Sequence, residues 1–219
     1  MINYILGAGA QGRVASDILV DTGKYKVINF IDDDTNLLGK RINGLKVIGN
    51  IKQLLRQNPA KVQVHIAIGN PVLRLSIAER IRKKGIRLMN VIHPSAVIVK
   101  STVMGAGNMI GANAVINSNT KIGDNNIINT AAVVEHDCVI EDGTSISPKA
   151  LIGGRVKLKK GAFICSSAVV LPRRMIGEFA VVAAGSLVTK DVKDKTLVMG
   201  LPAKLVEKLG VDFNWDRLL

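Results

Sequence analysis

The chain has 219 residues, of which 47% are hydrophobic but only 3% aromatic, and a formal net charge of +13. This length fits one large or two small domains, and the aliphatic composition favours repetitive β-structure over a core with aromatic anchors. The positive charge favours acidic partners, although no basic run with interleaved aromatic residues predicts a nucleic-acid partner. Two cysteines without a CxxC motif and the lack of a long apolar run predict a cytoplasmic protein without membrane insertion.

The N-terminal third has the pattern of a Rossmann-like nucleotide-binding domain, which we expect over residues 1–92. An apolar strand at residues 2–6 precedes a GxGxxG motif and a helix. The motif consists of Gly7, Gly9 and Gly12. Such glycines let the backbone approach a phosphate at the N-terminus of the helix. Further strands are expected at residues 25–31, 45–49 and 62–69, and a helix at 71–85.

The small size of this region favours a nucleotide sugar over NAD as its ligand. A GxGxxG motif alone indicates NAD, but about ninety residues make roughly one mononucleotide half of a dinucleotide fold. We therefore favour a nucleotide-sugar site over NAD. A glycine turn that binds nothing is the third interpretation.

A period of six residues runs through residues 97–192. All sixteen six-residue blocks have an aliphatic residue at the second position, from Ile98 to Val188. Repeats of this kind stack into a solenoid, and three flat faces require about eighteen residues per coil. The pattern resembles the hexapeptide-repeat left-handed parallel β-helix, which we expect over residues 93–200.

The C-terminal residues 201–219 are expected to form a cap and a tail. The GLPAK turn closes the solenoid, and we expect a short helix from Ala203 to cover the unpaired strand edges. Trp215 either packs on the domain or covers a ligand.

A histidine between two acids, in the sequence VVEHDC, is the strongest candidate for chemistry. His136 falls at a corner of its coil, and Gly154 occupies the same corner one coil later. An imidazole titrates near pH 6.5 and suits a general base, and a carboxylate on its other nitrogen would fix the tautomer. The alternative is a surface histidine with incidental acidic neighbours. His65 and His93 do not lie at a spacing that meets His136, so no metal site is expected.

An ordered set of motifs resembles a known family. These motifs are AIGN at 67–70, IHPSA at 92–96, INTAAVVEHDCVI at 128–140, ISPKALIGG at 146–154 and GLPAK at 200–204. Together with the GxGxxG start, they are similar to the bacterial sugar O/N-acyltransferases. This family includes sialic acid O-acetyltransferases and UDP-4-amino-sugar N-acetyltransferases. The resemblance implies a homotrimer with sites between neighbouring β-helices, acetyl-CoA as donor, and a nucleotide-linked amino sugar as acceptor.

The resemblance also implies roles for residues near the histidine. His136 would be the general base, Asp137 would orient it, and Asn129 would be an active-site amide. Gly154 would offer its backbone N–H to the thioester carbonyl. Several members have a second histidine near the acetyl group where this chain has Ser145.

The remaining implied roles concern binding. The residues expected to meet CoA are Gly154, Arg173, Arg174, Lys190, Pro202 and Lys204. The residues expected to meet the phosphates of the sugar nucleotide are Gly7, Gly9, Gly12 and Arg13. Asp33 or Asp34 would contact its ribose or uracil.

Three functions remain open from the sequence. The first is acetyl-CoA-dependent N-acetylation of a UDP-linked 4-amino sugar. The second is O-acetylation of sialic acid or a related sugar with the same residues. The third is a non-catalytic trimer that binds a sugar nucleotide. Because Cys138 sits at an inward-pointing position, we expect no covalent acyl-enzyme.

Overall fold

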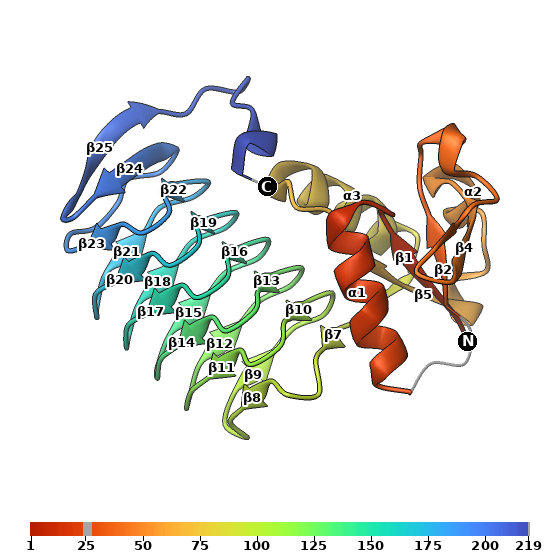
Figure 1. Cartoon of the computed structure of the whole chain (residues 1–219), viewed down its shortest axis with the longest axis horizontal. Coiled ribbons are helices and arrows are strands. Elements are labelled where there is room, and N and C mark those ends of the chain that lie inside the picture. Colours follow the sequence, from red (N-terminus) through yellow and green to blue (C-terminus); the bar gives the residue numbers. More distant parts are fainter. Residues whose placement is uncertain (24–27, 219) are drawn as a thin grey trace.

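The structure is a computed structural model that describes residues 1–23 and 28–218. It contains an N-terminal α/β part and a long stack of short strands, joined near residue 90 (Figure 1). The beginning of the strand expected at residues 25–31 lies outside the described residues. The remainder of that strand is present as Ile28–Ile31.

The N-terminal part is built on a six-stranded sheet with the order β3-β4-β2-β1-β5-β6. The strands are β1 (Ile2–Leu6), β2 (Ile28–Ile31), β3 (Arg41–Ile42), β4 (Leu45–Gly49), β5 (Val62–Ile66) and β6 (Arg87–Leu88). All neighbouring pairs are parallel except β3 and β4. The helices are α1 (Ala10–Asp21), η1 (Thr35–Leu37), α2 (Ile51–Leu54), η2 (Pro59–Lys61) and α3 (Pro71–Lys83).

Helix α1 connects the two parts through its apolar side. Its buried residues share a cluster with Met109 and Ile127, which belong to the stack of short strands. Helix α3 begins where the Asn70 side chain accepts hydrogen bonds from the backbone N–H groups of Val72 and Leu73, with Pro71 at the first helical position. Such capping satisfies donors that have no partner within the helix.

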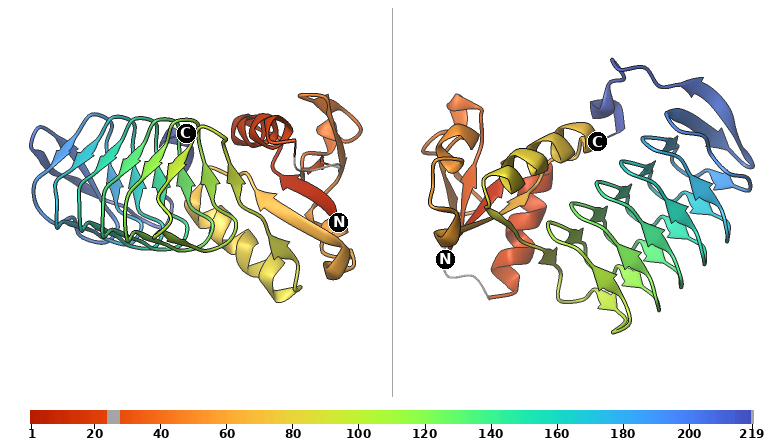
Figure 2. Two further views of the ribbon diagram at one scale, coloured as in Figure 1. Left: turned by 90° about the horizontal axis from the view of Figure 1, so that it is seen from below. Right: turned by 180° about the vertical axis from the view of Figure 1, so that it is seen from behind.

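The second part is the expected left-handed parallel β-helix, a prism with three sheets (Figure 2). One sheet contains β7 (Val91–Ile92), β10 (Met109–Ile110), β13 (Ile127–Ile128), β16 (Ser145–Ile146), β19 (Phe163–Ile164), β22 (Val181–Val182), β24 (Thr196–Gly200) and β25 (Ala203–Lys208). The next contains β8 (Val97–Ile98), β11 (Val115–Ile116), β14 (Val133–Val134), β17 (Leu151–Ile152), β20 (Val169–Val170) and β23 (Leu187–Val188). The third contains β9 (Val103–Met104), β12 (Lys121–Ile122), β15 (Val139–Ile140), β18 (Lys157–Leu158) and β21 (Met175–Ile176). Strand β7 already pairs with β10, so the prism begins at Val91.

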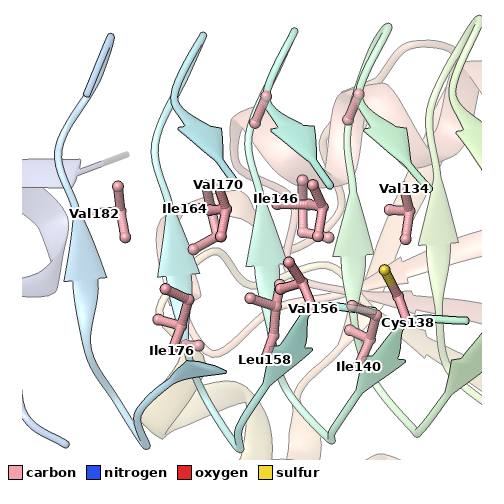
Figure 3. Packing of buried hydrophobic residues seen from close by; sticks show 14 of the residues in the cluster. Val134, Cys138, Ile140, Ile146, Val156, Leu158, Ile164, Val170, Ile176 and Val182 are labelled. Atoms are coloured by element: carbon pink, nitrogen blue, oxygen red, sulfur yellow. The ribbon is translucent and has the colours of Figure 1, made fainter. Parts of the chain in front are cut away.

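The inward column of the prism confirms the six-residue pattern. The second-position residues from Ile110 to Val188 are all buried, whereas Ile98 and Met104 in the first coil are half-buried. Figure 3 shows these side chains stacked along the axis, so each coil covers the apolar surface of its neighbour. A terminal coil has a neighbour on one side only, which explains the greater exposure of the first two.

The C-terminal cap differs from the expected helix. Residues Ala203–Lys208 form strand β25, which pairs antiparallel with β24. The expectation of a helix from Ala203 was wrong because the turn at residues 200–202 reverses the chain beside an open sheet edge. Pairing with that edge satisfies the backbone groups of β24, which a helix would have left unpaired.

Trp215 packs on the prism. It lies in η3 (Trp215–Leu218), and its ring centroid is 5.1 Å from that of Phe213 and 6.3 Å from those of Phe163 and Phe179. This cluster brings the C-terminal segment near the N-terminal end of α3 (Figures 1 and 2). In the described part of the chain, no helix has the length and apolar character that crossing a bilayer requires. The cytoplasmic location stays a prediction.

Candidate active site

His136 lies on the edge of the prism that follows strand β14. Its side chain is 52% exposed. The parallel register aligns β14, β17, β20 and β23, so the residues two positions after each strand follow one another along this edge. These residues are His136, Gly154, Pro172 and Lys190. We call this row, with the adjacent Asp137, Arg155 and Arg173, the His136 edge.

Asp137 holds the imidazole in place. Its Oδ2 lies 2.8 Å from His136 Nδ1. Asn119 donates a hydrogen bond to Asp137 Oδ1 at 3.3 Å, and Arg155 Nε lies 3.6 Å from Oδ2. The bond to His136, and secondly that from Asn119, lower the pKa of Asp137 below its ordinary value. The carboxylate therefore remains ionised near neutral pH. It favours the tautomer in which His136 Nδ1 carries the proton and donates a hydrogen bond to Asp137, so Nε2 is available as a base.

Gly154 leaves room for the ring. A Cβ atom at this position would lie 2.7 Å from His136 Nε2 and 2.8 Å from Cε1. The Gly154 carbonyl accepts from Arg173, but its own N–H has no acceptor among the described residues. A free backbone N–H beside the imidazole can donate to an oxygen that gains negative charge during a reaction.

The expected CoA residues fall on the same edge and beyond it. Arg173 lies one coil after Gly154, and its backbone N–H donates to the Gly154 carbonyl. The guanidinium of Arg174 lies 3.9 Å from the carboxylate of Asp191. Lys190, Pro202 and Lys204 line a cleft of about 430 Å³ at the C-terminal end of the prism. Three coil steps separate the His136 level from the Lys190 level, which corresponds to about 14 Å at the usual strand spacing. That length suits an extended thioester donor whose phosphates reach the lysines.

A second group of expected residues lines a cavity between the N-terminal part and the prism. The cavity has a volume of about 530 Å³. Its walls come from the glycine motif, the loop after β5, the sheet of β13, β16 and β19, and the C-terminal segment. Its lining includes Gly7, Gly9, Ile68, Gly69, Asn129, Ser145, Phe163 and Leu218. We call it the Gly9 cavity.

The three positions of the motif differ in what a side chain would meet there. Gly7 has φ +103°, and a Cβ there would collide with the Ala67 carbonyl. Gly9 is the N-cap of α1 and has open space where a side chain would be. Gly12 is buried inside α1, where any side chain would collide with the Gly7 backbone. Gly9 thus opens the cavity, whereas Gly12 allows the close approach of helix and strand.

The charged residues expected at the nucleotide lie outside the cavity lining. Arg13 is exposed on α1. Asp33 accepts a hydrogen bond from the Ile51 N–H at 2.9 Å, and Asp34 caps η1. Their roles toward a nucleotide stay predictions. Asp32, the first residue of the same acidic run, had no role assigned from the sequence; it accepts a hydrogen bond from the Ala8 N–H at 2.7 Å and so fixes the glycine loop.

The two groups lie on different edges of one chain. Asn129 and Ser145 flank the edge after β13, beside the Gly9 cavity, whereas His136 and Gly154 lie on the next edge. His136 and Asn129 nevertheless belong to one coil, and Ser145 and Gly154 both belong to the next. The two groups of residues therefore lie at matching heights along the prism.

Cys138 is close to His136 in sequence but points inward (Figure 3). Its Sγ lies 3.2 Å from the Gly153 carbonyl oxygen, and burial raises the pKa of the thiol to about 11. Only the thiolate is an effective nucleophile, so this thiol does not suit covalent catalysis. Within residues 1–23 and 28–218, no group of three or more His, Cys, Asp and Glu side chains is arranged to hold a metal ion.

Sequence reasoning missed Asn119 and Arg155 as partners of Asp137. Both lie eighteen residues from Asp137, one coil before and one coil after it. The coil length inferred from the repeat could have identified them.

Each of the two parts of the chain matches a known protein family. Residues 4–81 match the PglD N-terminal domain family, and residues 119–154 match the bacterial transferase hexapeptide (six repeats) family. A curated relative, the GDP-perosamine N-acetyltransferase of Escherichia coli O157:H7, is 32% identical over 108 residues. That match covers 47% of this chain and 48% of the relative, so the chain spans about half the length of the curated relative that it matches.

Solved structures match over nearly the whole chain. A mutant GDP-perosamine N-acetyltransferase from Caulobacter crescentus, in complex with CoA and GDP-perosamine, is 32% identical with a TM-score of 0.88. The match covers 95% of this chain and 98% of that one. The acetyltransferase domain of PglB from Neisseria gonorrhoeae, in complex with acetyl coenzyme A, is 32% identical with a TM-score of 0.89 and coverages of 93% and 98%. These matches confirm the resemblance and the fold expected from the sequence.

Proposed function

Because the chain belongs to the hexapeptide-repeat sugar acetyltransferases with a PglD-type N-terminal domain, we propose that it acetylates the amine of a nucleotide-linked 4-amino sugar. Acetyl-CoA is the donor. The observation that carries the proposal is the His136 edge, where an imidazole held by Asp137 faces a glycine with a free N–H. The edge leads to the basic cleft at Lys190 and Lys204, which suits the phosphates of CoA.

The reaction follows from these groups. The amine nitrogen attacks the thioester carbonyl carbon, and the C–N bond forms as its proton passes to His136 Nε2. The Gly154 N–H donates to the carbonyl oxygen while that oxygen is negatively charged. The C–S bond then breaks, and the thiolate leaves as CoA after taking the proton from the imidazolium. Asp137 stabilises the imidazolium between these steps.

The acceptor site requires a second copy of the chain. We propose a trimer in which the His136 edge of one copy faces the Gly9 cavity of its neighbour. Two facts support this arrangement: the half-sites lie on different edges, and they have matching heights along the prism. A threefold axis parallel to the prism preserves those heights and builds three identical sites.

A thiol-release assay with acetyl-CoA and a panel of sugar nucleotides tests the proposal. The panel contains a UDP-linked 4-amino sugar, GDP-perosamine and free sialic acid. The first tests the uridine nucleotide expected from the sequence, and the second is the ligand of a solved relative. We expect release of CoA with a nucleotide-linked amino sugar and none with the 4-hydroxy analogue. Release with sialic acid alone would replace the proposal by O-acetylation, and no release would leave only a binding function.

A further inference from the structure

Arg74 of helix α3 is a buried cation at the junction of the two parts. It is 1% exposed. Its Nη1 donates hydrogen bonds of 2.7 Å to the carbonyl oxygens of Ile68 and Gly69, which belong to its own domain. Both of these residues also line the Gly9 cavity.

The same guanidinium reaches across to the prism. Its Nε donates to the Asn125 carbonyl at 2.9 Å, and its Nη2 donates to the Gly143 carbonyl at 2.7 Å and to Ser145 Oγ at 2.9 Å. Every acceptor is neutral, and no described carboxylate pairs with Arg74. Burying a charge without a counterion is costly. Joining the N-terminal part to the prism therefore does not fully explain why a cation is buried at this junction.

Ser145 is the polar exception in an apolar column. The outward residues of the sheet that faces the N-terminal part are aligned by the parallel register. They are Val91, Met109, Ile127, Ser145, Phe163 and Val181. Ser145 is 4% exposed and is the member of this column that meets the buried arginine.

The hydrogen bond from Arg74 determines what the serine can do. A hydroxyl has one donor and two acceptor positions, and here one lone pair of Oγ is occupied. The Ser145 hydroxyl proton has no acceptor among the described residues, and the residue lines the Gly9 cavity. A hydroxyl that accepts from a cation is also a stronger donor to its next partner.

We propose that Arg74 is a positioning residue for substrate binding: it holds Ser145 Oγ so that the hydroxyl donates its hydrogen bond to an oxygen of the sugar nucleotide in the Gly9 cavity. This inference rests on the proposed function, which supplies the sugar nucleotide as the ligand of the Gly9 cavity. It assigns Ser145 to the acceptor substrate, whereas the sequence analysis expected it near the acetyl group.

The test is a double-mutant cycle on the assembled protein with Ser145→Ala, Arg74→Lys and the double variant. Calorimetry measures the Kd of GDP-perosamine and of a UDP-linked 4-amino sugar without acetyl-CoA, and steady-state kinetics measures the KM of acetyl-CoA. Loss of one such hydrogen bond corresponds to a roughly tenfold increase in Kd. We expect that increase for Ser145→Ala, with the KM of acetyl-CoA unchanged.

The cycle separates positioning from structural support. Arg74→Lys should also raise the Kd but should add nothing in the Ser145→Ala background, although it lowers the Tm in both backgrounds. Equal increases in Kd in both backgrounds, an unchanged Kd in Ser145→Ala, or a shift in the KM of acetyl-CoA instead would each overturn the inference. If Arg74→Lys does not fold, an unchanged Kd in Ser145→Ala still overturns the inference.

The two proposals fail differently. A wild-type protein that binds the sugar nucleotide but releases no CoA contradicts the proposed function, and the Kd values still decide the role of Arg74. A wild-type protein that binds neither sugar nucleotide overturns both.

Discussion

Substituting Gly154 by alanine perturbs the imidazole without perturbing the fold. The added Cβ would lie 2.7 Å from His136 Nε2, whereas ordinary contacts begin near 3.4 Å, so the ring must withdraw by about 0.7 Å. Misplacing a reacting group by ~1 Å can lower a rate by ~10²-fold. We therefore expect kcat to fall roughly 10- to 100-fold. The backbone at Gly154 is outside the left-handed region, so alanine adds no backbone strain.

The assay is initial-rate CoA release with saturating acetyl-CoA and sugar nucleotide, together with a thermal melt. The Tm should stay close to that of the wild type, because the collision is with an exposed side chain. In a His136→Ala background, Gly154→Ala should have no further effect on kcat. Full kcat in the single variant, or an equal loss in both backgrounds, would refute the claim that the glycine acts through the imidazole.

Three further predictions concern single residues. His136→Ala should lower kcat by ~10²–10⁴-fold with little change in the Kd of CoA by calorimetry, and an unchanged rate would remove it from the mechanism. Cys138→Ala should retain turnover and a sequential rather than ping-pong rate pattern; a ping-pong pattern would indicate an acyl-enzyme. Burial lowers the pKa of His65 to about 4, so the unfolded chain binds a proton between pH 6.5 and 4 that the native chain does not. Acidification through that window should therefore lower the free energy of unfolding by about 3 kcal/mol, measured by urea denaturation at pH 7 and pH 4, and His65→Met should remove most of this dependence.

The prism could be predicted because its repeat fixes where each residue lies in the coil and which residues align between coils. One coil takes eighteen residues, so the alignment of His136 with Gly154 followed from counting, as did the burial of the column from Ile110 to Val188. The hairpin of β24 and β25 could not be predicted in this way. It lies beyond the last repeat, where pairing depends on an open sheet edge that the local sequence does not describe.

The contacts of the N-terminal part were harder to anticipate for the same reason. No repeat relates Arg74 to Ser145, which lie 71 positions apart, and their meeting depends on how α3 packs against the prism. Asp33 carries a role that its position after a strand did not reveal, because its partner, the N–H of Ile51, comes from a later helix. Motifs predicted the region of the candidate site, whereas tertiary packing determines the partner of each side chain.

The central claim is that each site combines the His136 edge of one copy with the Gly9 cavity of another. Complementation between two inactive variants tests it. His136→Ala removes the base, and Gly9→Trp fills the cavity from a position with open space around it. In a closed ring of three copies that contains both variants, about one third of the sites combine two intact halves. Co-expressed and purified together through two tags, which removes trimers of a single variant, the mixed protein should recover about one third of wild-type CoA release. A mixture as inactive as its parents would contradict a shared site.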